Sequence, residues 1–225
     1  MGNLHRLIAF DLDGTLVDSR KDLSDSANDL IVELGGAPQT EEAIGMMIGE
    51  GAALLVRRAL EAAGLGDRPG GLKRFLEIYD TRLLNHTRPY EGIPDVVRVA
   101  REHARVVVIT NKGVRPSERI LEGLGLRDLF AEVVGGDGPL PRKPDPAALI
   151  ALMDRAGTTA EQTLLIGDSP VDHETAQRAG VRCCMATYGF GYAKFSADRL
   201  TGREWMVDHP SAIADVIKEF ARSSG

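Results

Sequence analysis

The chain of 225 residues contains 43% hydrophobic residues and has a formal net charge of −6 at pH 7. This length suffices for one large domain or for a core domain with a smaller companion. The acidic balance argues against a broad basic surface for nucleic acid or for an acidic membrane. The two cysteines, Cys183 and Cys184, are adjacent, which excludes a disulfide framework or a zinc site of repeated Cys-x-x-Cys pairs.

We expect both thiols to be reduced and buried in an apolar run. The chain begins with a strand-like segment rather than a signal-like sequence, and no apolar run reaches the ~20 residues that span a bilayer. We therefore expect a cytoplasmic protein.

The first predicted strand covers residues 7–10, a short apolar run. Residues 19–89 then show no convincing strand but three helical patterns, at 22–34, 51–63 and 72–84. We predict that residues 19–89 form a small helical domain, and that residues 1–18 and 90–225 form the core domain. The alternative is that these helices pack on the sheet like the others.

Beyond this segment, strands and helices alternate. Strands are predicted at residues 106–109, 164–166 and 181–185, with weaker candidates at 133–134 and 206–207. Helices are predicted at residues 94–103, 116–124, 146–156 and 171–179, where prolines mark the starts and glycines the ends. Alternation of this kind predicts an α/β fold with a doubly wound, Rossmann-like parallel sheet.

Polar residues follow three of the predicted strands, and the carboxyl ends of parallel strands meet in one crevice. Asp11 comes directly after the first strand, where a rigidly held carboxylate is a candidate nucleophile toward phosphorus. Asp13 lies on the same side of an extended chain and is a candidate general acid and base. Gly14 permits a sharp turn of the backbone, and Thr15 offers a hydroxyl that fixes the loop.

Further along the chain, Thr110 supplies a hydroxyl, and the backbone amides of Asn111 and Lys112 are candidates for an anion-binding turn. Lys143 precedes a proline and is a candidate for neutralising the nucleophile and the phosphoryl group. Close carboxylates that face a phosphate need a counter-ion, so we assign Mg²⁺ to Asp11 and Asp168, although Mn²⁺ suits the same oxygen ligands. Each motif alone is also typical of a turn or of a capped helix, and the four in order favour a catalytic site.

These motifs, read together, resemble the phosphatases of the haloacid dehalogenase superfamily over essentially the whole chain. The motifs are Asp11-Leu12-Asp13-Gly14-Thr15, Thr110, Lys143-Pro144 and Gly167-Asp168-Ser169-Pro170-Val171-Asp172. The resemblance implies that Asp11 is the nucleophile, Asp13 the acid and base, Thr110 a hydrogen-bond donor to phosphate and Lys143 the charge stabiliser. It also implies a Mg²⁺ site formed by the Asp11 carboxylate, the Asp13 carbonyl and Asp168, with Asp172 in support. Because the dehalogenase branch lacks the second aspartate, Asp13 favours phosphoryl chemistry.

The helical insertion resembles the cap of subclass I members of that superfamily, which closes over the site and selects the substrate. Residues 48–52, 135–137 and 187–192 resemble phosphoglycolate phosphatases in particular, which implies 2-phosphoglycolate as the substrate. Four cap residues become candidates for substrate binding beside Thr110 and Asn111: Gly49, Glu50, Gly51 and Arg57.

Glu50 departs from the family pattern, which often has a neutral amide at this position. Its charge would repel the substrate carboxylate unless the side chain points away or pairs with Arg57 or Arg58. The neighbouring glycines still offer backbone amides at a helix start, which suit a carboxylate.

Three enzymes of the same superfamily are alternatives: a sugar-phosphate phosphatase, a β-phosphoglucomutase-like isomerase and a pyrophosphatase. A catalytically silent phosphate-binding regulatory protein is an alternative of a different class, although sensing a ligand requires no nucleophile beside an acid. We expect a small phosphate ester as the ligand, with neither nucleic acid nor membrane as partner. The sequence predicts no oligomeric state.

Overall fold

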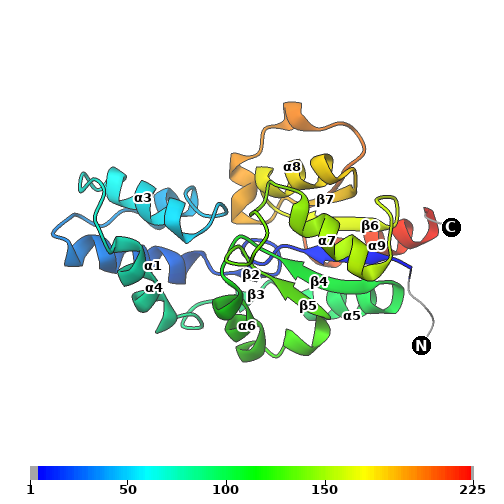
Figure 1. The fold of residues 1–225 in the computed structure, drawn as a ribbon, viewed down its shortest axis with the longest axis horizontal. Coiled ribbons are helices and arrows are strands. Elements are labelled where there is room, and N and C mark those ends of the chain that lie inside the picture. The colour runs from blue at the N-terminus through cyan, green and yellow to red at the C-terminus, as the bar shows by residue number, and fades with distance from the viewer. Residues whose placement is uncertain (1–4, 224–225) are drawn as a thin grey trace.

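The computed structural model describes residues 5–223 and has a six-stranded sheet at its centre (Figure 1). The strand order is β5-β4-β1-β6-β7-β8, and every neighbouring pair is parallel. The strands are β1 (Leu7–Phe10), β4 (Arg105–Ile109), β5 (Glu132–Val134), β6 (Thr163–Gly167), β7 (Arg182–Ala186) and β8 (Trp205–Val207). The ends of the predicted core, residues 1–4 and 224–225, lie outside the described residues.

Helices cover both faces of this sheet, because successive strand residues point to opposite sides. Ile8 and Phe10 of β1 belong to the larger apolar cluster, and Leu7 and Ala9 belong to the smaller one. Helices α5 (Ile93–His103), α6 (Val114–Gly123) and α9 (Ser211–Ser223) pack on the first face. Helices α7 (Ala147–Ala156) and α8 (Pro170–Ala179) pack on the second face. The predicted doubly wound α/β fold is confirmed.

Four helices lie between β2 (Val17–Asp18) and β3 (Arg88–Pro89), and we call residues 19–89 the helical segment. They are α1 (Arg20–Glu33), α2 (Glu41–Gly45), α3 (Ala52–Ala62) and α4 (Gly71–Asp80). These helices contact one another, and Figure 1 shows α1, α3 and α4 at one end of the molecule, beyond the sheet. β2 and β3 pair antiparallel, so the chain enters and leaves the segment side by side.

Some elements differ from the sequence prediction. The sequence prediction lacks helices α2 and α9 and the two-residue strands β2 and β3. The shortest of these elements depend on contacts that the local sequence does not contain. Pro116 is the third residue of α6 rather than the first. The described part of the chain also contains three 3₁₀ helices: η1 (Arg127–Leu129), η2 (Phe190–Lys194) and η3 (Ala197–Arg199).

Cys183 and Cys184 are buried and free of disulfides, as predicted. Among residues 5–223, every helix is too short or too polar to cross a bilayer.

Candidate active site

Asp11 and Asp13 lie at the carboxyl edge of the sheet, directly after β1. The backbone N–H of Asp11 donates to the carbonyl of Ile166 on β6 at 2.9 Å, which fixes the position of this residue between two strands. Gly14 has φ +88°, and a Cβ atom there would lie 2.0 Å from Asp168 Oδ2. Glycine is therefore required where the first loop meets the loop after β6.

Lys143 forms the central ion pair of the site. Its Nζ lies 2.9 Å from Asp11 Oδ1 and 2.5 Å from Asp172 Oδ1, and its side chain is 3% exposed. Burial alone would lower the pKa of Lys143, but the charges of Asp11 and Asp172 outweigh burial and raise it. The amine therefore stays protonated beside the candidate nucleophile.

Asp172 is held at the start of α8 by a capping box. Its Oδ2 accepts hydrogen bonds from the backbone N–H of Ser169 at 3.1 Å and from the Ser169 hydroxyl at 2.5 Å. Its Oδ1 accepts a hydrogen bond from Lys143 Nζ. Both oxygens thus have protein donors, so Asp172 is placed to position Lys143.

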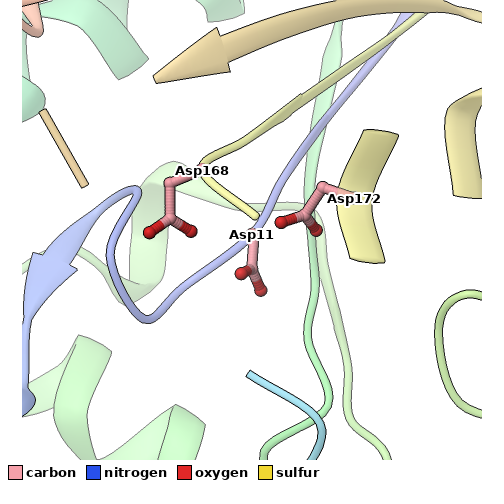
Figure 2. A group of neighbouring side chains, drawn as sticks. All are labelled: Asp11, Asp168 and Asp172. Carbon is pink, nitrogen blue, oxygen red and sulfur yellow. The ribbon is translucent and has the colours of Figure 1, made fainter. Parts of the chain in front are cut away.

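Three buried carboxylates, from Asp11, Asp168 and Asp172, gather within 4.8 Å of one another. Figure 2 shows Asp11 between the other two, with the three carboxylates on the same side of their backbones. Asp168 Oδ2 also accepts a hydrogen bond from the backbone N–H of Gly191 at 2.7 Å. Figure 2 therefore shows a compact acidic cluster built from two loops and the first turn of α8.

Burial raises the pKa of Asp11 to about 7, with Lys143 opposing the rise and Asp172 adding to it. Burial and the charges of Asp172 and Asp11 also raise the pKa of Asp168 well above its usual value. Three carboxylates gather around one ammonium group, so the ionised cluster carries more negative charge than Lys143 neutralises. Oxygen donors with excess negative charge fit a hard divalent cation, so the cluster suits a metal ion such as Mg²⁺.

The loop after β4 brings Thr110, Asn111 and Lys112 to the same edge. Asn111 Nδ2 donates to the carbonyls of Gly49 at 3.0 Å and Lys143 at 2.9 Å, so it ties the loop to the helical segment. The backbone N–H of Lys112 donates to Thr110 Oγ1 at 3.2 Å. This amide therefore donates within the turn and not to an anion, which differs from the expectation from the sequence.

The side chain of Lys112 is a feature that the sequence did not indicate. Its Nζ lies 2.9 Å from Asp13 Oδ2 and donates to the hydroxyl of Tyr79, on α4, at 2.8 Å. Burial would lower the pKa of Lys112, but Asp13 and Tyr79 outweigh burial and raise it. Asp13 also accepts a hydrogen bond from the Ser19 hydroxyl through Oδ1. Asp13 is thus held by a cation and by a hydroxyl.

A small cavity of about 60 Å³ lies between these residues and the helical segment. We call its polar side the core wall, formed by Asp11, Asp13, Thr110 and Lys112. We call its apolar side the helical wall, formed by Leu23, Ile48, Leu55, Phe75 and Tyr79. A more open groove of about 610 Å³ adjoins it and includes Lys73 and Arg142.

The predicted cap residues are not all brought to this cavity. Gly49 and Gly51 line it, both with positive φ, and Glu50 lies between them. Glu50 Oε1 lies 2.6 Å from Arg58 Nη1, so Glu50 pairs with one of the two arginines that the sequence offers as partners. Arg57 is 61% exposed and pairs with Glu61 at 3.8 Å. The structure therefore places Arg57 away from the predicted substrate-binding residues.

Comparisons with known proteins agree with this fold. Residues 8–186 match the model of the haloacid dehalogenase-like hydrolases. A phosphoglycolate phosphatase of Rhodospirillum rubrum is 43% identical over 194 residues, covering 82% of this chain and 80% of that protein. A phosphoglycolate phosphatase of Pseudomonas putida is 36% identical over 224 residues, covering 96% of this chain and 79% of that protein.

A crystal structure of a predicted phosphoglycolate phosphatase from Haemophilus somnus superposes with a TM-score of 0.87 at 30% identity, covering 97% of this chain and 99% of that one. The fold and the family predicted from the motifs are both confirmed. The chain belongs to the haloacid dehalogenase-like hydrolase family.

Proposed function

We propose that this protein is a phosphatase that hydrolyses 2-phosphoglycolate to glycolate and phosphate. The observation that carries the proposal is the shared cavity of Asp11 and Asp13, with the Lys143 ammonium 2.9 Å from Asp11. A nucleophile, an acid and a cation at one site are what a two-step phosphoryl transfer requires. The names of the relatives in Rhodospirillum rubrum and Pseudomonas putida support this substrate.

In the first step, a carboxylate oxygen of Asp11 attacks the phosphorus atom and the ester P–O bond breaks. Asp13 donates its proton to the departing oxygen, which leaves as the hydroxyl of glycolate. In the second step, Asp13 takes a proton from water, whose oxygen attacks the same phosphorus. The bond between Asp11 and phosphorus then breaks and releases phosphate, which restores both aspartates.

Lys143 and Thr110 act on the phosphoryl group in this proposal. Lys143 reduces the repulsion between the Asp11 carboxylate and the incoming phosphate dianion, and Thr110 donates a hydrogen bond to a phosphate oxygen. Asp172 holds Lys143 in place through the ion pair at 2.5 Å.

We also propose that Asp11, Asp168 and the backbone carbonyl of Asp13 hold Mg²⁺, with Asp172 in support. The bound ion would supply charge neutralisation for the phosphate oxygens. The buried acidic cluster supports a divalent cation without choosing between Mg²⁺ and Mn²⁺.

The helical segment serves as a cap domain over the core in this proposal. The cavity of about 60 Å³ beside Asp11 and Asp13 favours a small leaving group, whereas a hexose would have to extend into the adjoining groove of about 610 Å³. Arg58 pairs with Glu50, which reduces the repulsion that Glu50 would exert on a substrate carboxylate. A small acidic ester is therefore favoured over a sugar phosphate.

The test is phosphate release from a panel of esters, each with Mg²⁺ and with EDTA. The panel contains 2-phosphoglycolate, hexose and triose phosphates, pyrophosphate and p-nitrophenyl phosphate. We expect metal-dependent hydrolysis with the highest kcat/KM for 2-phosphoglycolate. A higher kcat/KM for a sugar phosphate or pyrophosphate would reject 2-phosphoglycolate as the preferred substrate. Conversion of a sugar phosphate without phosphate release would indicate a mutase. A folded protein that binds but does not turn over any ester would indicate a regulatory protein.

The covalent step has a separate test. Acid quenching during turnover followed by mass spectrometry is expected to find one added phosphoryl group on the peptide that contains Asp11. A phosphoryl group on another residue would reject Asp11 as the nucleophile.

A further inference from the structure

The charges around the cavity are unevenly distributed. The helical wall is apolar, and within residues 5–223 Lys112 is the cation among the side chains that line the cavity. Lys143 is not among the residues that line the cavity, and its ammonium group pairs with two carboxylates. Lys112 is therefore the residue to which an anionic leaving group has access.

Lys112 has donor capacity for a ligand. Among the described residues, the polar partners of its Nζ are Asp13 Oδ2 at 2.9 Å and the Tyr79 hydroxyl at 2.8 Å. An ammonium group has three N–H donors, so a third hydrogen bond can go to a ligand. The Nζ also lies 4.6 Å from the centre of the Tyr79 ring, which stabilises a cation at this place.

The position of Lys112 relative to Asp13 limits what it can bind. An acid that protonates the leaving oxygen must come within about 2.6–3.2 Å of it. Lys112 Nζ lies 2.9 Å from the Asp13 carboxylate, so it is about two hydrogen-bond lengths from the leaving oxygen. A carboxylate whose carbon is two bonds from the ester oxygen, as in 2-phosphoglycolate, falls within reach of Nζ.

We propose that the Lys112 ammonium group binds the carboxylate of the substrate and selects phosphate esters that carry a second negative charge next to the leaving oxygen. This inference rests on the proposed phosphatase function and deepens it by naming the residue that recognises the acid. Tyr79 contributes from α4, so recognition takes place where the core meets the helical segment.

The experiment compares two substrates of the same length, 2-phosphoglycolate and 2-hydroxyethyl phosphate, in which a hydroxymethyl group replaces the carboxylate. Lys112→Met is expected to lower kcat/KM for 2-phosphoglycolate at least about 10-fold more than for 2-hydroxyethyl phosphate, mainly through KM. Lys112→Arg keeps the charge and is expected to keep most of the preference. Lys73→Met, which removes an exposed cation of α4 outside the cavity, is the matched control.

An equal loss for the two substrates would overturn the inference, because Lys112 would then act only through Asp13. Binding provides a second measurement that does not depend on turnover. In the Asp11→Asn background, Lys112→Met is expected to weaken the binding of 2-phosphoglycolate at least about 10-fold, as measured by calorimetry. The affinity for 2-hydroxyethyl phosphate should change little. Unchanged affinity of the Lys112→Met variant for 2-phosphoglycolate would also overturn the inference.

Failure of the proposed function gives a different result. In that case the unmodified protein itself does not release phosphate from 2-phosphoglycolate. Failure of the Lys112 inference alone leaves that activity of the unmodified protein intact, and Lys112→Met then leaves the ratio between the two substrates unchanged.

Discussion

The core wall and the helical wall of the cavity are held in place by different forces. The two aspartates of the core wall form ion pairs, Asp13 with Lys112 of the same wall and Asp11 with Lys143 outside it, at 2.9 Å each. The helical wall is held by packing, with Phe75 stacked on Tyr79 at 5.9 Å between ring centres. One wall is fixed by charge and by strand ends, and the other by apolar contact between helices.

This difference separates two tasks. Reactive groups need fixed positions and defined protonation states, which buried ion pairs at strand ends provide. Selection by size needs only a surface of suitable shape, which packed helices provide and which tolerates change. We therefore expect substitutions of Asp11 and Asp13 in the core wall to affect the rate for every ester, and substitutions in the helical wall to affect the choice among esters of different size.

The largest effect is expected for Asp11→Asn. The amide cannot form the covalent intermediate, so kcat should fall by at least about 10⁴-fold for all substrates. Phosphate release under single turnover measures this loss, and circular dichroism shows whether the fold persists. Asp95→Asn, at a side chain that is 84% exposed on α5, is the control and should retain full activity. A folded Asp11→Asn variant with near-normal turnover would contradict both the mechanism and the separation of tasks.

The buried charge of Asp11 also predicts a pH dependence of stability in the metal-free protein. Burial raises its pKa from 3.8 to about 7, so the folded state resists ionisation between these values while the unfolded state ionises freely. The free energy of unfolding relative to the Asp11→Asn variant should be greatest below pH 4 and fall by about 4 kcal/mol as the pH rises to 7.

Urea unfolding in EDTA at several pH values measures this difference. Asp11→Asn is the reference because it has no ionisable group at this position. A difference that stays constant from pH 4 to 7 would mean that Asp11 ionises normally in the folded state.

A smaller effect is expected on the helical wall. Leu55→Ala enlarges the cavity from α3, so kcat/KM for phenyl phosphate should rise about 10-fold relative to 2-phosphoglycolate. Leu60→Ala is the matched control, since Leu60 is equally buried in α3 but does not line the cavity. Both variants should lose about 2–5 kcal/mol of stability. Equal selectivity in the two variants would show that the helical wall does not select by size.

The two walls also differ in how far the sequence predicts them. Asp11, Thr110 and Asp168 follow strands of one parallel sheet, and this topology brings their loops together whatever the helices do. The contact of Lys112 with Tyr79 depends on where α4 packs over the loop after β4, and no local pattern contains that information. The same holds for Gly191, whose backbone N–H reaches Asp168 from η2, after β7. Periodicity predicted α1, α3 and α4 but not the cavity between them and the core.

The smallest effects separate two neighbouring cations of α3. Arg58→Ala leaves the Glu50 carboxylate without its partner beside the cavity, so the KM for 2-phosphoglycolate should rise about 3-fold while kcat changes little. Arg57 faces solvent and pairs with Glu61, so Arg57→Ala should leave both constants within about 2-fold. Steady-state kinetics on both variants measures the contrast. A larger effect from Arg57→Ala than from Arg58→Ala would mean that the helical segment moves enough during turnover to bring Arg57 to the substrate, and would restore the role that the sequence first suggested for it.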